Sequence, residues 1–253
     1  MSYYSKFPML FFSNMLHPYT QAYINAMSTK PSAQITKAID NFVRGIVDDG
    51  LWLKFDALYI FKMHTAQAAQ LNLIQPGTHD LSTSGSPVFT AGAGYAGAAS
   101  GYLQTSANIS TFSKFSQDSA HIGGYIESAQ NANTPAIGSD LQNIEIRPIT
   151  AGTTYFSINT TGNAIGRAVA SGVGHPVASR LNSSEAFFVK NGALSGAVAS
   201  KASVAVSANP FKVCGGIFNN NTSQFSFAHV GSGLTVAECD DLYQRILTYR
   251  TEY

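Results

Sequence analysis

The chain has 253 residues, of which 11% are charged and 45% are hydrophobic, and its formal net charge is +1. Because a typical domain carries about 25% charged residues, this low fraction predicts a neutral surface of small polar side chains. These values exclude a basic nucleic-acid-binding face, an intrinsically disordered chain and, with two cysteines, a disulfide scaffold.

The N-terminal segment is rich in aromatic side chains and shows no signal sequence. Its apolar run from Phe7 to Phe12 is shorter than the apolar region of about 7–15 residues in secretory signals. We therefore expect synthesis in a cytoplasm, no membrane contact and reduced, buried cysteines. The aromatic side chains pack either on the chain's own sheet or, as an arm, on a neighbouring subunit. The candidate arm residues are Tyr3, Tyr4, Phe7, Phe11 and Phe12.

Two helices are predicted before Gly50. The first is short and covers residues 19–27, and the second covers 32–49. Ser32 can cap the second helix, and apolar residues recur through it at helical spacing. Gly50 is typical of the position just after a helix. We therefore divide the chain into an N-terminal arm and helical extension, residues 1–50, and a second part, residues 51–253.

Beyond residue 50 the pattern is one of short strands separated by polar turns, about 10–20 residues apart, as in β-sandwiches and barrels. The predicted strands are 55–61, 88–90, 101–103, 121–127, 141–148, 153–159, 185–190, 203–206, 211–218 and 225–230. Asn191-Gly192 predicts a type I′ hairpin turn. A closing helix over 235–250 begins with Thr235 and Glu238, which form a capping-box pattern.

Motifs for chemistry are weak. Residues 92–97 match G-x-G-x-x-G, but no helix pattern follows as dinucleotide binding requires, which favours a turn between strands. Glycoside hydrolysis needs two facing carboxylates, and the close acidic pairs fall in helices. The six histidines show no metal or triad spacing. We expect no enzyme activity, no cofactor and no metal. A loop calcium site stays open, with Asp80, Asp118 and Asp140 as weak candidates.

Several motifs resemble phage-encoded structural proteins with a concanavalin A-like (LamG-like) sandwich. They are GLWLKFDALYIF at 50–61, the glycine- and tyrosine-rich stretch 94–108, FVKNG at 188–192, PFKVCGGIFN at 210–219, and the strand from 225 into the terminal helix. All are packing and turn residues. The resemblance implies a mainly β protein, a concanavalin A-like jelly-roll β-sandwich with an N-terminal helical extension and a C-terminal helix.

The resemblance and the low charge together predict a non-enzymatic structural component of a tailed-phage virion, in the capsid or the tail, that acts through assembly. Its partners would be further copies in a symmetric homo-oligomer and other virion proteins. Residues 83–140, with four charged side chains, would face a neighbouring subunit. The alternative is a lectin-like module that binds host surface glycan. Its candidate contacts are Tyr95, Tyr102, Asn108 and Asn131.

Overall fold

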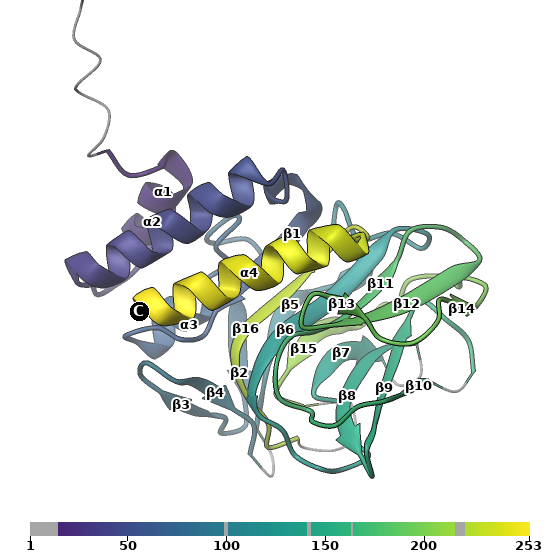
Figure 1. The fold of residues 1–253 in the computed structure, drawn as a ribbon. Coiled ribbons are helices and arrows are strands. Elements are labelled where there is room, and N and C mark those ends of the chain that lie inside the picture. Colours follow the sequence, from purple (N-terminus) through teal and green to yellow (C-terminus); the bar gives the residue numbers. More distant parts are fainter. Residues whose placement is uncertain (1–14, 99–100, 141–142, 163, 216–220) are drawn as a thin grey trace, which may run out of the picture.

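A computed structural model describes residues 15–98, 101–140, 143–162, 164–215 and 221–253. Two antiparallel sheets and a layer of helices build the molecule (Figure 1). The helices are α1 (Pro18–Ala26), α2 (Ala33–Asp48), α3 (Ala66–Gln70) and α4 (Val236–Glu252). Two single 3-10 turns lie at Trp52–Lys54 and Ile109–Thr111. The predicted arm residues, from Tyr3 to Phe12, lie outside the described residues.

Sheet A has nine strands. Its main path runs β13-β12-β11-β6-β16-β4-β3, with β1 added beside β16 and β14 beside β12. Their bounds are β1 (Phe55–Ile60), β3 (Val88–Thr90), β4 (Gly94–Ala96), β6 (Ala120–Ser128), β11 (Pro176–Arg180), β12 (Glu185–Lys190), β13 (Ala193–Leu194), β14 (Ala199–Ser200) and β16 (Gln224–Gly231).

Sheet B has seven strands in the order β10-β9-β8-β7-β15-β5-β2. Their bounds are β2 (Leu81–Ser84), β5 (Tyr102–Asn108), β7 (Ile137–Asp140), β8 (Ile144–Thr150), β9 (Thr153–Ile158), β10 (Ile165–Ala168) and β15 (Pro210–Val213). In both sheets, several neighbouring strands come from segments that lie far apart in the sequence. The core between the sheets is therefore built from distant parts of the chain.

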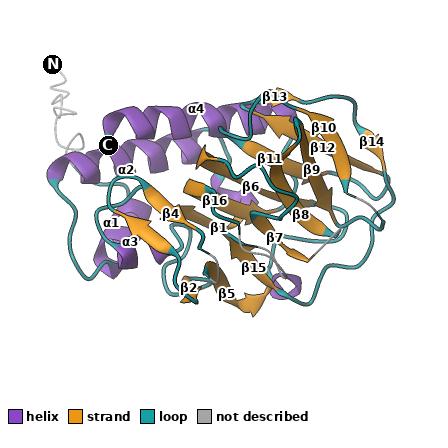
Figure 2. Ribbon diagram, turned by 90° about the horizontal axis from the view of Figure 1, so that it is seen from below, coloured by secondary structure: helices purple, strands orange, loops and turns teal. Residues whose placement is uncertain are grey.

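Aromatic contacts define three layers. Between the sheets, the rings of Phe156 and Phe188 stack at 5.3 Å. On the other face of sheet A, Phe227 lies 5.5 Å from Phe42 of α2 and 5.3 Å from Tyr249 of α4. Sheet A is therefore buried on both faces, and Figures 1 and 2 show α2 and α4 on the side of sheet A away from β8, β9 and β10.

The predicted mainly β sandwich with helices at both ends is confirmed. Ser32 caps α2 by accepting a hydrogen bond from the amide of Ile35. Asn191 and Gly192 adopt φ angles of 51° and 79° between β12 and β13, the two left-handed positions that a type I′ turn requires. The glycine-rich stretch at 92–97 forms the β3–β4 hairpin rather than the start of a helix, so it is not a dinucleotide-binding loop.

Two strand predictions are corrected. Residues 203–206 form no strand, since the segment crosses the edge of the sandwich. Its amides bond in turn to the carbonyls of Ser183 and Asn159, which leaves a single bridge to Thr160. The strand predicted from 211 to 218 ends at Val213, because Cys214 has a φ of 64° and turns the chain.

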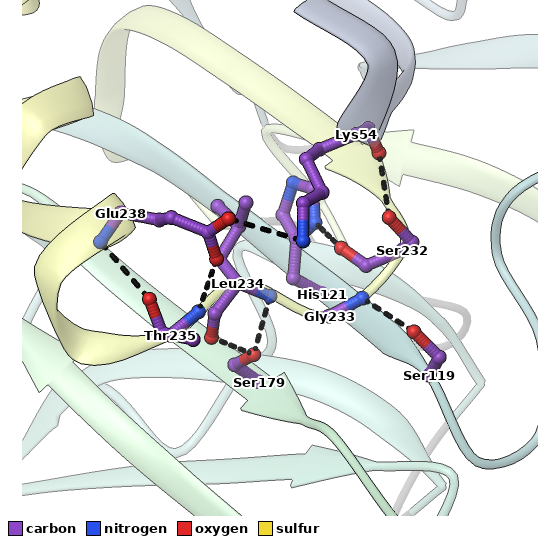
Figure 3. Close-up of polar contacts among 9 residues, drawn as sticks. All are labelled: Lys54, Ser119, His121, Ser179, Ser232, Gly233, Leu234, Thr235 and Glu238. Atoms are coloured by element: carbon purple, nitrogen blue, oxygen red, sulfur yellow. Dashed lines mark hydrogen bonds and ion pairs between the residues drawn. The ribbon is translucent and has the colours of Figure 1, made fainter. Parts of the chain in front are cut away.

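The loop between β16 and α4 is held by polar contacts to three other segments (Figure 3). The amides of Gly233 and Leu234 each donate to a serine hydroxyl at 3.0 Å, of Ser119 and Ser179 respectively. At the helix start, the Thr235 amide donates to Glu238 at 2.7 Å and the Glu238 amide donates to Thr235 Oγ1 at 3.2 Å. The predicted capping box is confirmed.

Removing the capping hydroxyl tests how strongly this junction fixes α4. We expect Thr235→Ala to lower the free energy of unfolding by about 1 kcal/mol, since the Glu238 amide loses its acceptor. Urea unfolding followed by circular dichroism measures the change. The matched control is Thr248→Ala, within α4, whose hydroxyl donates only to the carbonyl of Gln244. An equal loss in both variants would contradict a specific capping role.

Candidate functional site

The outer face of sheet B is a sheet surface without a helix layer over it (Figures 1 and 2). Strand alternation assigns its side chains, because successive residues of a strand point to opposite faces. Phe211 and Val213 of β15, for example, are fully buried in the core, so Lys212 between them lies on the outer face. The same argument places Gln104, beside the buried Leu103, on this face.

Register aligns these outer residues into a row across six strands. The cross-strand partners are Ser82↔Gln104, Gln104↔Lys212, Lys212↔Gly138, Gly138↔Glu145 and Glu145↔Ser157. At about 4.8 Å between neighbouring strands, the part from Ser82 to Lys212 spans about 10 Å. Ser82 is exposed and Gln104 and Lys212 are partly exposed, whereas Glu145 and Ser157 are buried. The accessible part of the row therefore lies on β2, β5 and β15.

Two tyrosines flank the row on the same face. Tyr102 pairs with Ser84 across β2 and β5, and Tyr155 pairs with Arg147 across β8 and β9. Both tyrosines are partly exposed. The face therefore combines aromatic rings with amide, hydroxyl and charged groups.

The charged pair on β8 is fully engaged. Arg147 donates through Nε and Nη2 to the two oxygens of Glu145 at 3.1 and 2.8 Å. Its Nη1 donates to Asn133 Oδ1 at 2.6 Å. Glu145 is only 1% exposed, so it orients Arg147 rather than facing solvent.

The opposite end of the row carries unengaged polar groups. The Lys212 ammonium lies 4.9 Å from the centre of the Tyr102 ring. Within the part of the chain that the structure describes, neither this ammonium nor the Gln104 carboxamide has a hydrogen-bond partner or an ion-pair partner. These donors are therefore available to a ligand. We define Ser82, Tyr102, Gln104 and Lys212 as the polar platform.

The four glycan contacts predicted from sequence fall in different places. Tyr102 belongs to the polar platform. Tyr95 is 2% exposed and lies in contact with Phe61 and Phe89, which removes it from any surface that a glycan can reach. Asn108 is exposed at the other end of β5, about 20 Å from Tyr102 at the usual rise per residue. The Asn131 side chain accepts from the amide of Ala151 and supports a turn. Gln104 and Lys212 were missed because no local motif marks them.

A cluster of three buried histidines lies under α4. His121, His175 and His229 are each 0% exposed. His175 and His229 share a hydrogen bond between their Nε2 atoms at 2.9 Å, and the His121 ring lies 5.1 Å from that of His229. Tyr243 of α4 stacks on His175 at 6.0 Å. The cluster is closed to ligands, as expected for His121 and His229 from their strand positions.

Burial decides the charge of this histidine cluster. Desolvation lowers the pKa of His121 to about 4 and that of His175 to about 3. It also holds the pKa of His229 well below its ordinary value, with the two neighbouring rings adding to the effect. The three rings are therefore neutral at pH 7 and have a structural role.

The residues described here contain no group of three or more His, Cys, Asp or Glu side chains that could hold a metal ion. Two of the weak calcium candidates are engaged otherwise. Asp80 accepts from the amides of Asn72 and Gly77, and Asp118 accepts from Ser203. The side chain of Asp140 lies outside the described part of the structure.

A hollow of about 200 Å³ lies between α2 and α4. It is lined by Gln34, Lys37, Ala38 and Glu252. Gln34 Nε2 donates to the Glu252 carbonyl at 3.1 Å, and the Glu252 carboxylate accepts from Asn41 at 3.0 and 3.1 Å. It lacks aromatic rings and most of its polar groups are paired, so the polar platform is the stronger candidate.

Comparisons with known proteins support the fold. No family model matches the chain, and no curated protein matches its sequence. A mutant of Trypanosoma rangeli sialidase displaying trans-sialidase activity aligns with a TM-score of 0.56 and 10% identity over 85% of this chain and 39% of its own. The receptor binding domain of botulinum neurotoxin C/D mosaic serotype aligns with a TM-score of 0.54 and 10% identity over 75% of this chain and 51% of its own.

These similarities are to jelly-roll β-sandwiches, which confirms the predicted fold class. The chain corresponds to less than two thirds of either protein. Among the described residues, no helix is long and apolar enough to cross a membrane.

Proposed function

We propose that the protein is a carbohydrate-binding module and that its polar platform is the binding surface. The observation that carries this proposal is the accessible part of the outer face of sheet B, on β2, β5 and β15, where Tyr102, Gln104 and Lys212 have no competing hydrogen bonds or ion pairs among the described side chains. Carbohydrates present hydroxyl groups and apolar ring faces together, and binding sites of this kind combine a few convergent polar groups with aromatic side chains.

Sheet A does not offer a comparable binding surface. The outer face of sheet A is covered by α2 and α4 through contacts of Phe227 with Phe42 and Tyr249. A ligand at that face would have to displace a packed helix. The fold is shared with a sialidase and with a neurotoxin receptor binding domain, but fold alone does not assign function. The proposal therefore rests on the platform.

We propose binding without catalysis. A glycosidase needs two carboxyl groups that flank the scissile bond. Glu145 is the one described carboxylate in the row of outer residues on sheet B, and it is buried and bound by Arg147. Because Arg147 donates to both oxygens of Glu145, neither oxygen is free to transfer a proton to a sugar.

A tyrosine substitution tests the platform. We expect Tyr102→Ala to weaken binding to glycan-array hits about tenfold or more, since the variant loses an aromatic contact and the support of Lys212. The matched control is Tyr19→Ala on α1, a tyrosine that is 41% exposed and far from sheet B. Wild-type protein that binds no glycan on a broad array would contradict the proposal.

An assembly role in a tailed-phage virion is the second candidate. The specific observation in its favour is the exposure of Met15, Tyr19 and Leu53, at 68%, 41% and 77%, next to the start of the described chain. Exposed apolar side chains often mark interfaces. The aromatic arm, the homo-oligomer and the covered 83–140 surface stay predictions. Sedimentation of the full chain would test the homo-oligomer.

A further inference from the structure

We infer that the glycan bound by the polar platform carries an anionic group, a carboxylate or a sulfate ester, that pairs with Lys212. This inference rests on the carbohydrate-binding function proposed above and names the ligand class of the same surface. The charge of Lys212 is unpaired among the described residues, its ammonium lies over an aromatic ring, and its cross-strand neighbour on β7 is a glycine.

The charge of Lys212 is uncompensated. The ion pairs of the described chain are Arg44–Asp40, Lys54–Glu238, Arg147–Glu145, Arg245–Asp49 and Arg250–Glu127. Glu145, the described acid of the same row, is occupied by Arg147 through both oxygens. Among the described side chains of this face, Lys212 therefore carries the one unpaired positive charge, which attracts an anionic group.

The ammonium of Lys212 is held in place before any ligand binds. It lies 4.9 Å from the centre of the Tyr102 ring, in the geometry of a cation–π contact. The aromatic ring restrains the flexible side chain but accepts no conventional hydrogen bond from it. The three N–H donors of the ammonium remain available to carboxylate or sulfate oxygens.

The positions beside Lys212 suit a charged sugar. Gln104 is its direct partner on β5 and can donate and accept hydrogen bonds with neighbouring hydroxyls. On the other side its partner is Gly138 on β7, which contributes no side chain. An added Cβ at Gly138 would lie 2.2 Å from the carbonyl oxygen of Ile144, so this position must be glycine. No side chain from this position on β7 therefore stands beside Lys212.

A single anionic group fits this site better than a polyanion. Phosphate backbones are bound by several Lys and Arg side chains at once. Here Arg147 is committed to Glu145 and Asn133, and the whole chain has a net charge of +1. One free cation beside an amide and an aromatic ring recognises one charge on an otherwise neutral sugar.

The test is an array that presents uronic-acid and sulfated glycans beside their methyl-esterified and unsulfated counterparts. We expect the full-length protein to bind the acidic member of a pair about tenfold or more tightly, as charge-assisted hydrogen bonds allow. In Lys212→Gln, the two members of each pair should bind equally. Comparing the uronic-acid pairs with the sulfate pairs identifies the anionic group.

Two further variants sharpen the result. Lys212→Arg should retain part of the acidic preference. Lys62→Gln is the matched control, because Lys62 also lies over a tyrosine ring, that of Tyr253 at 5.6 Å, but on the helix side. If Lys212→Gln binds acidic glycans as tightly as wild type, or if neutral and acidic members bind equally, this inference fails while the carbohydrate-binding proposal stands. If no glycan of either kind binds, both fail.

Discussion

Lowering the pH from 7 to 5 is expected to decrease the free energy of unfolding by about 5 kcal/mol, through the histidine cluster under α4. A buried histidine stays neutral in the folded protein but can take up a proton in the unfolded chain. Each such histidine therefore lowers the free energy of unfolding by about 1.4 kcal/mol for every pH unit below its unfolded pKa of about 6.5. Three such rings act together here. A natural domain has about 5–15 kcal/mol of stability, so this change is a large part of the total.

The direction follows from the lowered pKa values. Burial lowers the pKa of His121 to about 4 and that of His175 to about 3, and it also holds the pKa of His229 well below its usual range. Between pH 6.5 and about 4, the unfolded chain therefore binds more protons than the folded protein. The stability that these rings provide is fully present above pH 6.5 and is lost as the pH falls through this window.

Structure explains why protonation cannot be accommodated locally. The His121 Nδ1 donates to the carbonyl of Ser232, and the pair of His175 and His229 shares one proton between two Nε2 atoms. Phe55 packs edge-on against His121 and His229 at 5.4 and 5.9 Å. Lys190 opposes an added charge on His175, whereas at His121 the effect of Lys54 is outweighed by that of Glu238. A second proton between the two Nε2 atoms would place two donors against each other, and a proton on either Nδ1 of the pair would find no acceptor, since both atoms are buried without a hydrogen-bond partner among the described residues.

Urea unfolding at pH 7 and pH 5 measures the effect, with Trp52 as the fluorescent reporter, since it is the one tryptophan and is 6% exposed. We expect His121→Gln to remove about a third of the pH-dependent loss, because one of three titrating rings is gone. The control is Phe55→Leu, which disturbs the same packing but removes no titrating group. It should lower the free energy of unfolding by the same amount at pH 7 and at pH 5. Identical stabilities of the wild type at the two pH values would refute the prediction.

Replacing Arg180 by methionine is expected to lower the free energy of unfolding by about 3–5 kcal/mol. The guanidinium is fully buried and donates to the carbonyls of Ile158, Asn182 and Lys201 at 2.9, 3.0 and 2.9 Å. It thereby joins the end of β9 in sheet B to two segments around sheet A. Burial lowers the pKa of Arg180, and the charge of Asp118 partly offsets this.

The physical reason for the large effect is the group left behind. Methionine fills much of the volume, but the buried carbonyl oxygen of Ile158 and those of Asn182 and Lys201, whose hydrogen bonds are partly buried, lose their donor. Unpaired buried polar groups are strongly destabilising. Arg180→Lys should be intermediate, because a compact ammonium cannot imitate the planar fork of a guanidinium. The control Arg44→Met removes an i,i+4 pair of an exposed arginine with Asp40 and a hydrogen bond to the carbonyl of Met15, and it should change stability by about 1 kcal/mol or less. Arg180→Met with wild-type stability would show that the three carbonyls find other donors.

Local patterns explain which elements could be predicted. Ser32, Thr235 and Asn191-Gly192 act through residues at most four positions away, so their spacing in the sequence is sufficient to predict the caps of α2 and α4 and the β12–β13 turn. The strand at 185–190 could also be predicted from its own residues and the turn that follows it. By contrast, β7 was missed, since its four residues include a glycine and a buried serine, Ser139, whose hydroxyl donates to the carbonyl of Asn209.

The candidate site depended on pairing between distant segments. Gln104 and Lys212 are neighbours through the β5–β15 ladder, although 107 residues lie between them in the sequence, and Gly138 enters from β7. No periodicity along the chain reports such a pairing. For the same reason, Tyr102 and Tyr95 looked equivalent in sequence, and only strand alternation and packing separated the partly exposed ring from the buried one.

The sequence by itself determined the class of the protein: short strands with turn residues and two capped helices predict a mainly β sandwich or barrel with helices at both ends. These features are encoded within a few residues of each other, where backbone preferences act. The tertiary structure alone decided which sheet face the helices cover, which polar side chains remain unpaired and which histidines meet. Those outcomes are set by strand order and register, which join residues that local preferences cannot connect.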